Sequence, residues 1–276
     1  MSISILILTL NEERNLPECL HSVAWADDVV VLDSHSSDRT VQIAQESGAS
    51  VIQRRFDNWA AHQNWAMENI SFANRWVFYL DADERMTPEL RAEIESIARD
   101  SSETRVAFYV GRKNYFMGRW IKHAMPPGHI MRFFVPKSIR FERLVNPVPV
   151  VQGEHGYLHN FFLHYNFSKG IEEWIDKHNR YSTLEALEGM KLLRGTQHDG
   201  QSLVSRDPAR RRRALKNLSF RLPGRAILKF LYMYIIRRGF LDGRAGFTYC
   251  VLQAVYEYMI SLKMTETVRR ERGLPI

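Results

Sequence analysis

Short apolar runs and stretches of helical spacing alternate along the first hundred residues of the chain. Runs of four to seven apolar residues have the length of buried strands, and the segments between them repeat apolar side chains at helical intervals. This pattern predicts strands at 3–9, 29–32, 50–53 and 75–80, and helices at 15–23, 39–47, 59–70 and 87–99. Strands that alternate with helices form a mostly parallel sheet flanked by helices, so the predicted fold class is α/β.

The rest of the chain changes pattern twice. Residues 105–167 predict strands at 106–110, 129–135 and 157–164, separated by loops rich in Pro and Gly, and these strands would complete the sheet. From Lys169 onward the spacing is helical, at about 170–194, 207–219, 223–238 and 245–264. We therefore expect an α/β core over 1–168 and a C-terminal amphipathic helical appendage over 169–276.

Composition is that of a packed protein. Hydrophobic residues make up 45% of the 276 residues, which argues for a core rather than disorder. The two cysteines, Cys19 and Cys250, lie far apart and form no disulfide framework, so a reducing compartment is expected. The first apolar run meets Asn11-Glu12-Glu13 at once, which predicts a first strand and not a signal peptide.

The net charge of +7 is concentrated near the C-terminus. Residues 206–244 carry 12 Lys and Arg against 2 Asp and Glu, whereas residues 1–205 are mildly acidic. The basic segment contains the apolar run Phe230–Ile236, which is too apolar for a solvated face that binds nucleic acid, so nucleic acid is disfavoured. No uncharged stretch reaches the roughly 20 residues of a membrane-spanning helix.

This combination favours helices that lie in a membrane interface. Lys and Arg over 206–262 would reach anionic headgroups while aromatic and aliphatic side chains enter the boundary. A helical hairpin packed on the body or on another subunit remains the alternative, and the sequence leaves the oligomeric state open.

Two carboxylates follow the fourth predicted strand. Asp81 and Asp83 flank Ala82, and if strand geometry continues through them they project from one face, because strand side chains alternate. Ligands of open α/β sheets bind at this edge. Mg²⁺ and Mn²⁺ take carboxylate oxygens and bridge to phosphates, so the pair predicts a metal site for a phosphate-bearing molecule. The alternative is a solvated acidic turn.

Polar residues also follow the first two strands. Thr9, Asn11 and Glu12 end the first strand and Asp33 ends the second, so they would share the edge with Asp81 and could bind a base or ribose. Capping of the next helices is the alternative. The chain contains neither a P-loop nor a dinucleotide fingerprint, so a bound metal ion would have to neutralise the negative charge of the phosphates.

Four motifs in this order resemble the family 2 glycosyltransferases with a GT-A fold, and within them the bacterial branch of lipopolysaccharide-core β-glucosyltransferases. They are Thr9-Leu10-Asn11-Glu12-Glu13, Val31-Leu32-Asp33-Ser34-x-Ser36-x-Asp38-x-Thr40, Gln63-Asn64-Trp65-Ala66 and Leu80-Asp81-Ala82-Asp83-Glu84. The later Leu163-His164-Tyr165 and Lys177–Ser182 extend the likeness to about residue 190.

The resemblance implies a nucleotide-sugar donor, usually a uridine diphosphate (UDP) sugar, on residues 1–100, with residues 101–168 facing the acceptor. Asp33 would hold the base, and Asp81 and Asp83 would serve the ribose and the metal. The donor contacts would be Thr9, Asn11, Glu12, Asp33, Asn64, Asp81, Ala82 and Arg112, and the ligands of Mn²⁺ or Mg²⁺ would be Asp81, Asp83 and His164. A basic surface loop is the alternative for Arg112, and a backbone-bonded histidine the alternative for His164.

The catalytic base departs from the family pattern. Relatives commonly carry a His-Glu pair after the strand that here contains Arg132, but this chain has Val145-Asn146-Pro147 there. Glu142 is the nearest acid and our predicted base, with Asp83 as its catalytic partner on the metal side, and Glu154 is the alternative base.

The leading hypothesis is an inverting, metal-dependent glycosyltransferase that acts on a lipid-linked saccharide or lipopolysaccharide core. It would be cytoplasmic and peripheral on the inner face of the bacterial inner membrane. A nucleotidyltransferase is a second hypothesis, although the Gly-rich basic loop expected after its first strand is absent. A non-catalytic scaffold that binds nucleotides and attaches to membrane or nucleic acid is the third.

Overall fold

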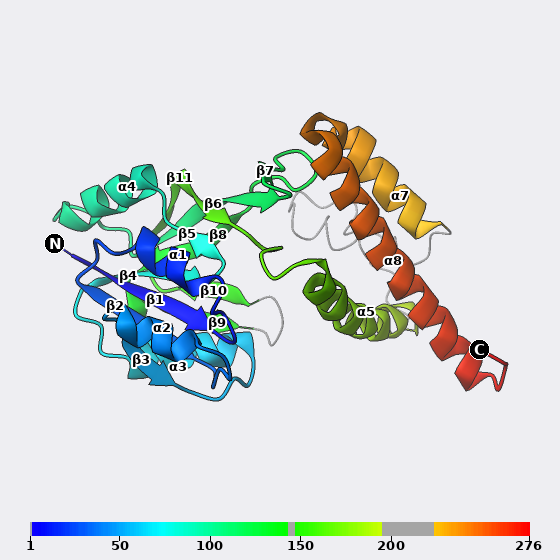
Figure 1. Cartoon of the computed structure of the whole chain (residues 1–276), viewed down its shortest axis with the longest axis horizontal. Coiled ribbons are helices and arrows are strands. Elements are labelled where there is room, and N and C mark those ends of the chain that lie inside the picture. Colours follow the sequence, from blue (N-terminus) through cyan, green and yellow to red (C-terminus); the bar gives the residue numbers. More distant parts are fainter. Residues whose placement is uncertain (1, 143–146, 195–223) are drawn as a thin grey trace. The chain divides into compact units, whose positions relative to one another are not determined.

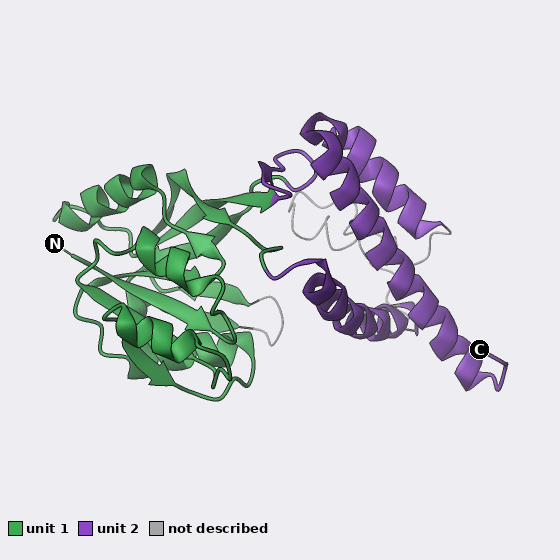
Figure 2. Ribbon diagram, in the orientation of Figure 1, with its two compact units in different colours: residues 1–115, 126–168 green, residues 116–125, 169–276 purple. Residues whose placement is uncertain are grey.

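The computed structural model describes residues 2–142, 147–194 and 224–276. These residues form two compact units (Figure 2). Unit 1 comprises residues 1–115 and 126–168, and unit 2 comprises residues 116–125 and 169–276. The helix expected at 207–219 lies outside the described residues.

Eight strands of a nine-stranded sheet form the centre of unit 1, and the ninth, the short β7, lies in segment 116–125 of unit 2 (Figure 1). The main path of the sheet runs β3-β2-β1-β4-β8-β6-β11-β5, and β7 pairs with β6. The strands are β1 (Ile3–Thr9), β2 (Asp28–Asp33), β3 (Ser50–Gln53), β4 (Trp76–Asp81), β5 (Glu84–Arg85), β6 (Ala107–Phe116), β7 (Arg119–Trp120), β8 (His129–Phe134) and β11 (His155–His164).

The directions of the strands determine which strand ends lie at the same edge of the sheet. The strands β3, β2, β1 and β4 are mutually parallel, and β6 and β11 are parallel to each other. Between these groups β8 runs antiparallel to both β4 and β6. The ends of β1, β2, β4, β6 and β11 therefore lie at one edge, and the predicted α/β, mostly parallel sheet is confirmed.

Four helices cover the two faces of this sheet. On one face pack α1 (Leu16–Ser22), α2 (Thr40–Glu46) and α4 (Pro88–Arg99), with buried side chains such as Leu16, Ala44 and Ile94 in a single apolar cluster. On the other face packs α3 (Trp59–Asn69), together with a separate hairpin of β9 (Ile139–Glu142) and β10 (Val148–Val151). A 3₁₀ turn, η1 (Pro136–Ser138), leads from β8 into that hairpin.

Unit 2 is helical, as the sequence predicts. Its long helices α5 (Ile171–Arg194) and α8 (Gly243–Glu271) pack through Ala186, Met190, Ile260 and Met264. The helix expected over 223–238 is α-helical only in α7 (Arg225–Leu231), continues as the π-helix η3 (Tyr232–Ile236) and stops at Arg238, whose φ is 59°. Among the described helices, none is long and apolar enough to cross a membrane.

A buried aspartate ties residues 116–125 to these helices. Asp242 ends the 3₁₀ turn η4 (Gly239–Asp242), and its Oδ2 accepts hydrogen bonds of 2.8 and 2.7 Å from the backbone N–H groups of His123 and Ala124. A buried carboxylate needs such donors, because leaving it unsatisfied costs more free energy than an ordinary hydrogen bond returns. The segment that follows β6 therefore belongs with unit 2.

Candidate active site

The acidic motif forms a turn between two strands. Strand β4 ends at Asp81, Ala82 and Asp83 form the turn, and Glu84 begins β5. Strand β5 pairs antiparallel with the end of β11, with Glu84 opposite His164. The strand geometry does not continue through Asp83, so the condition on which we expected Asp81 and Asp83 to project from one face is not met. The turn instead sends the two carboxylates to different partners.

Arg132 is the partner of Asp81. This arginine is buried in β8, and its Nη2 donates to Asp81 Oδ2 at 2.5 Å and to Glu84 Oε1 at 2.7 Å. Tyr79 donates its hydroxyl to Asp81 Oδ1 at 2.6 Å, and the Arg132 guanidinium lies 4.0 Å from the centre of the Tyr79 ring. Each oxygen of Asp81 thus accepts one hydrogen bond, and a buried arginine with fewer partners would be strongly destabilising.

Glu84 is the second carboxylate that Arg132 binds. Its Oε2 accepts from the backbone N–H of Asp81 at 3.0 Å, so the glutamate fixes the end of β4 as well as Arg132. Burial raises the pKa of Glu84 to about 7, although the nearby Arg132 opposes that rise. Burial thus favours the neutral form of this carboxyl group, whereas the charge of Arg132 favours its ionised form.

Asp83 faces His164. The imidazole Nδ1 lies 2.8 Å from Asn114 Oδ1, and because an amide oxygen only accepts, Nδ1 carries the hydrogen. In the neutral ring Nε2 then presents its lone pair to Asp83 Oδ2, 3.4 Å away. Two acceptors that face each other require a cation or a proton between them, so Asp83 and His164 fit a divalent ion.

The predicted metal set is only partly assembled. The structure brings Asp83 and His164 together, whereas the Asp81 carboxylate is held by Tyr79 and Arg132. Within the described residues, no three His, Cys, Asp or Glu side chains converge as a metal cluster. Mg²⁺ and Mn²⁺ commonly take one or two protein ligands and complete their shell with water and phosphate oxygens, so a pair fits such an ion.

The predicted nucleoside residues join two loops. The buried Asp33 carboxylate accepts from the Thr9 hydroxyl at 2.9 Å and from the backbone N–H of Ser36 at 2.8 Å. The Asn11 side chain accepts from Ser37 N–H, and Glu12 N–H donates to the Thr40 hydroxyl. These bonds make Asp33 and Asn11 anchors of the loops, and their contacts to a nucleoside remain predictions.

Asn64 contacts the strand that carries the predicted base. Its amide donates to Phe141 O at 2.8 Å and accepts from Phe141 N–H at 2.7 Å, as a paired strand would. Glu142, the next residue, is exposed at the end of β9. The structure thus assigns Asn64 to holding β9 on α3, and its donor contact remains a prediction.

Glu154 lies far from the acidic turn. It directly precedes β11 and accepts from the Thr104 hydroxyl, whereas His164 ends that strand. Ten residues of strand span about 33 Å. Glu154 is therefore at the opposite edge of the sheet from Asp83, which leaves Glu142 as the better candidate base.

Arg112 lies on β6, two residues before Asn114. Its Nε is buried and has no hydrogen-bond partner in the part of the chain that the structure describes. A buried donor without an acceptor is costly, so this atom fits an oxygen supplied by a ligand.

Sequence reasoning missed Tyr79, Glu84, Asn114 and Arg132. Arg132 was detectable in principle, because a cation inside the apolar strand His129–Phe134 must find buried carboxylates. Its partners were not detectable, since they lie 51 and 48 positions away in the chain.

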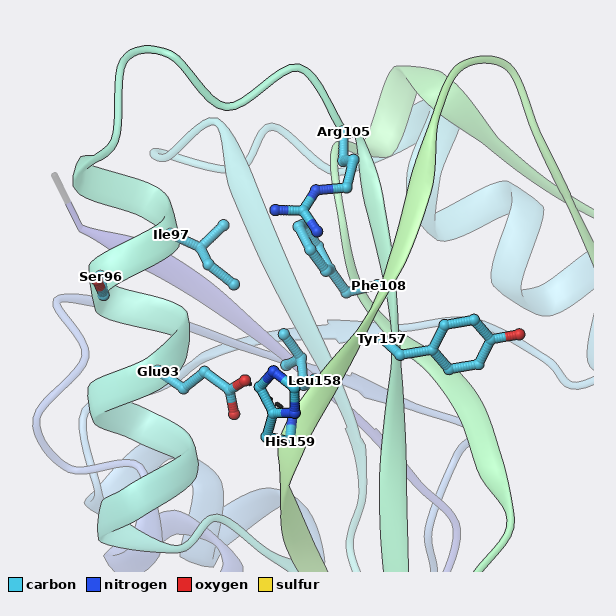
Figure 3. A pocket seen from close by; sticks show the side chains of 8 residues that line it. All are labelled: Glu93, Ser96, Ile97, Arg105, Phe108, Tyr157, Leu158 and His159. Carbon is cyan, nitrogen blue, oxygen red and sulfur yellow. Dashed lines mark hydrogen bonds between the residues drawn. The ribbon is translucent and has the colours of Figure 1, made fainter.

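A separate cavity of about 300 Å³ lies between α4 and the start of β11 (Figure 3). Glu93 lines it, but that carboxylate is taken by the backbone N–H groups of His159 and Asn160. Leu158 and His159 of β11 line the cavity, whereas Asp83 faces His164 at the end of that strand, so the cavity is separate from the acidic turn.

The fold and the site define an α/β protein whose sheet edge combines two hydrogen-bonded loops after β1 and β2, an acidic turn and the Asp83–His164 pair. The family model for glycosyl transferase family 2 matches residues 4–157, and the chain belongs to this family. It is a glycosyltransferase, and the resemblance stated from the sequence is confirmed. Because the chain belongs to this family, the nucleotidyltransferase hypothesis is wrong.

Relatives match along nearly the whole chain. An uncharacterized glycosyltransferase of Rickettsia typhi is 27% identical over 99% of this chain and 89% of its own. The lipopolysaccharide core biosynthesis glycosyltransferase LpsC of Rhizobium meliloti is 26% identical over 96% of this chain and 92% of its own. Among solved structures, the mannosyltransferase PcManGT of Pyrobaculum calidifontis, in complex with GDP-Man and Mn²⁺, aligns with 96% of this chain and 87% of that chain at 14% identity and a TM-score of 0.49.

The raised pKa of Glu84 predicts a pH dependence of stability. Its ordinary value of 4.5 rises to about 7 in the folded state, so its contribution is fully present below about pH 4.5 and is lost as pH rises through 7. We expect Tm of the wild type to fall more between these pH values than Tm of Glu84→Gln, measured by calorimetry. Glu95→Gln is the control. Arg91 holds the pKa of Glu95 below its usual range, so the contribution of Glu95 to stability is lost as pH falls, opposite to that of Glu84. Parallel Tm curves for the wild type and Glu84→Gln would contradict this assignment.

Proposed function

We propose that the protein transfers a sugar from a nucleoside diphosphate sugar, with UDP as the expected carrier, to a lipopolysaccharide core or another lipid-linked saccharide. The observation that carries this proposal is the Nε2 lone pair of His164, which faces the Asp83 carboxylate beside the nucleoside loops. The LpsC relative, named for lipopolysaccharide core biosynthesis, supports the acceptor class.

The donor would bind along the ends of the strands. Asp33, Thr9, Asn11 and Glu12 would surround the nucleoside, and Asp81 with Ala82 would lie next to the ribose. The unpaired Arg112 Nε and the Asn64 amide are the further donor contacts that we propose. Asp83 and His164 would hold Mn²⁺ or Mg²⁺, which, when bound, neutralises the leaving diphosphate.

The chemistry is a single displacement at the anomeric carbon. The acceptor hydroxyl oxygen attacks that carbon, the bond from the carbon to the diphosphate oxygen breaks, and its electron pair leaves with the diphosphate. Glu142 takes the hydroxyl proton. One attack from the face opposite the leaving group inverts the configuration.

Asp83→Asn tests the cation site. The amide keeps the size of the side chain but removes its charge, so we expect turnover of UDP-sugar with Mn²⁺ to fall by about a hundredfold or more. Release of nucleoside diphosphate across a panel of nucleotide sugars measures this and also identifies the donor. The control is Asp57→Asn, which removes a carboxylate of an exposed pair with Arg54. Undiminished turnover in Asp83→Asn would refute the cation site.

Glu142→Gln tests the base. Loss of the proton acceptor should lower kcat by about a hundredfold while donor KM stays near the wild-type value. Glu154→Gln should leave kcat unchanged, because that residue lies at the opposite edge of the sheet. The assignment fails if Glu154→Gln shows the larger loss. A pH profile of kcat/KM for both variants accompanies the measurement.

We also propose that unit 2 attaches the enzyme to the inner face of the bacterial inner membrane. Exposed apolar side chains follow one another from α7 to the start of α8, and we call this surface the apolar ridge. It consists of Ile227, Leu228, Leu231, Tyr232, Ile235, Ile236, Phe240, Leu241 and Phe247. Lys229, Arg237, Arg238 and Arg244 lie in the same stretch, and apolar groups interspersed with cations suit an anionic lipid surface. The predicted membrane segment 206–262 includes this ridge, but its first part, 206–223, lies outside the described residues.

Ile235→Asp combined with Ile236→Asp tests the ridge. Removing two apolar groups and adding two negative charges should weaken co-sedimentation of the full chain with phosphatidylglycerol vesicles by at least about tenfold. The control is Ile276→Asp, since Ile276 is 74% exposed and Ile236 is 71% exposed. Binding that neither the double variant nor salt reduces would show that another surface holds the membrane.

A further inference from the structure

Aromatic rings line one face of the paired strands β6 and β11. In register, Tyr157 lies opposite Tyr109, and Phe161 lies opposite Gly111. Beyond the paired His164 and Asn114, the rings of Tyr165 and Tyr115 stack with centroids 5.1 Å apart. We call these rings the aromatic strip: Tyr109, Tyr157, Phe161, Tyr115 and Tyr165.

In the first pair of the strip, Tyr157 is open to solvent and Tyr109 is partly buried. The Tyr157 and Tyr109 rings stack at 5.1 Å with 19° between their planes, and His129 meets Tyr157 edge-on at 5.5 Å. Tyr157 is nevertheless 60% exposed, and its ring points away from the cavity between α4 and β11 (Figure 3). A tyrosine so exposed contributes little to the core, so packing alone does not account for this ordered stack.

The middle of the strip depends on a glycine. A Cβ on Gly111 would lie 2.4 Å from two atoms of the Phe161 ring, so the ring rests directly on the β6 backbone. Lys113 Nζ lies 5.3 Å from the centre of the same ring. An aromatic surface and a cation therefore occupy one position of the strip.

The last pair joins the strip to the active site. Tyr165 N–H donates to Asp83 O at 2.9 Å, and Tyr115 directly follows Asn114, which orients His164. Arg85 lies 5.7 Å from the centre of the Tyr165 ring, so a second cation is present here. From Tyr109 to Tyr115 the strand runs about 20 Å, which is enough for several hexose rings.

These features match one class of ligand. Flat aromatic faces pack against the C–H faces of pyranose rings, and their polar tips bond to hydroxyls. Lys113 and Arg85 suit phosphate or carboxylate groups on the same ligand. A continuous path of rings to Asp83 would carry the terminal sugar toward the donor.

We propose that the aromatic strip is the acceptor subsite and that it binds an anionic saccharide chain whose last sugar reaches the Asp83 turn. This inference rests on the proposed function, since it names the acceptor of that reaction. The strip also gives Tyr157, at its far end, a role in selecting long acceptors over single sugars.

The test measures saccharide binding to the full chain without donor or metal. The probe is phosphorylated, deacylated lipopolysaccharide core oligosaccharide, studied by calorimetry. We expect Tyr157→Ala to weaken binding by about five- to tenfold. Tyr157→Phe keeps the ring and should stay within about twofold of the wild type. The matched control Tyr258→Ala removes a tyrosine that is 56% exposed in unit 2 and should bind as the wild type does.

A second comparison tests the charge. Lys113→Gln should weaken binding of the phosphorylated probe more than binding of the same oligosaccharide after dephosphorylation. Wild-type affinity in Tyr157→Ala, or no binding of either probe to the wild type, would overturn the proposal. Because donor and metal are absent, failure of the proposed function shows up separately, as absence of nucleoside diphosphate release.

Discussion

The arrangement of the active site depends on one buried arginine. Arg132 enters the sheet on the antiparallel strand β8 and binds Asp81 and Glu84, one on each side of the acidic turn. Because both partners also bond to the end of β4, the turn has a fixed shape, and Asp83 is left facing His164. Without that cation, the fully buried carboxylate of Glu84 would lose its charged partner, which is strongly destabilising.

As a result, the three acids of the turn have different partners. Asp81 and Glu84 share the ion pairs with Arg132, while Asp83 faces His164 and is the residue that we propose for the cation. Asn114 fixes the tautomer of His164, and the following Tyr115 begins the aromatic strip on the opposite face of β6. Because side chains alternate along β6, the strand presents Asn114 to the proposed cation site on one face and Tyr115 to the proposed acceptor on the other.

The sequence predicted the fold well where local pattern decides it. The strands at 3–9 and 50–53 match at both ends: the first is a long, mostly apolar run, and the second is the β-branched pair Val51-Ile52 between polar residues that follow a helix. The sequence could not predict that β8 runs antiparallel, since strand direction leaves no mark on periodicity. It also missed β9 and β10, which pair with each other in a hairpin outside the main sheet. In the site, the sequence motifs pointed to Asp83 and His164, which the structure places side by side. We expected strand geometry through Asp83, where the structure has a turn. The contacts of Arg132 that hold this turn join residues far apart in the sequence, so local pattern could not predict them.

The most direct measurement is pulsed electron paramagnetic resonance of Mn²⁺ added to the full chain with UDP. In the wild type we expect a ¹⁴N coupling from a histidine bound directly to Mn²⁺. In His164→Ala this coupling should be lost, because His164 Nε2 is the atom that faces Asp83. His62→Ala, which changes a buried histidine bonded to Arg54, should keep the coupling. A Mn²⁺–UDP complex without ¹⁴N coupling, or one that His164→Ala leaves unchanged, would contradict the cation site.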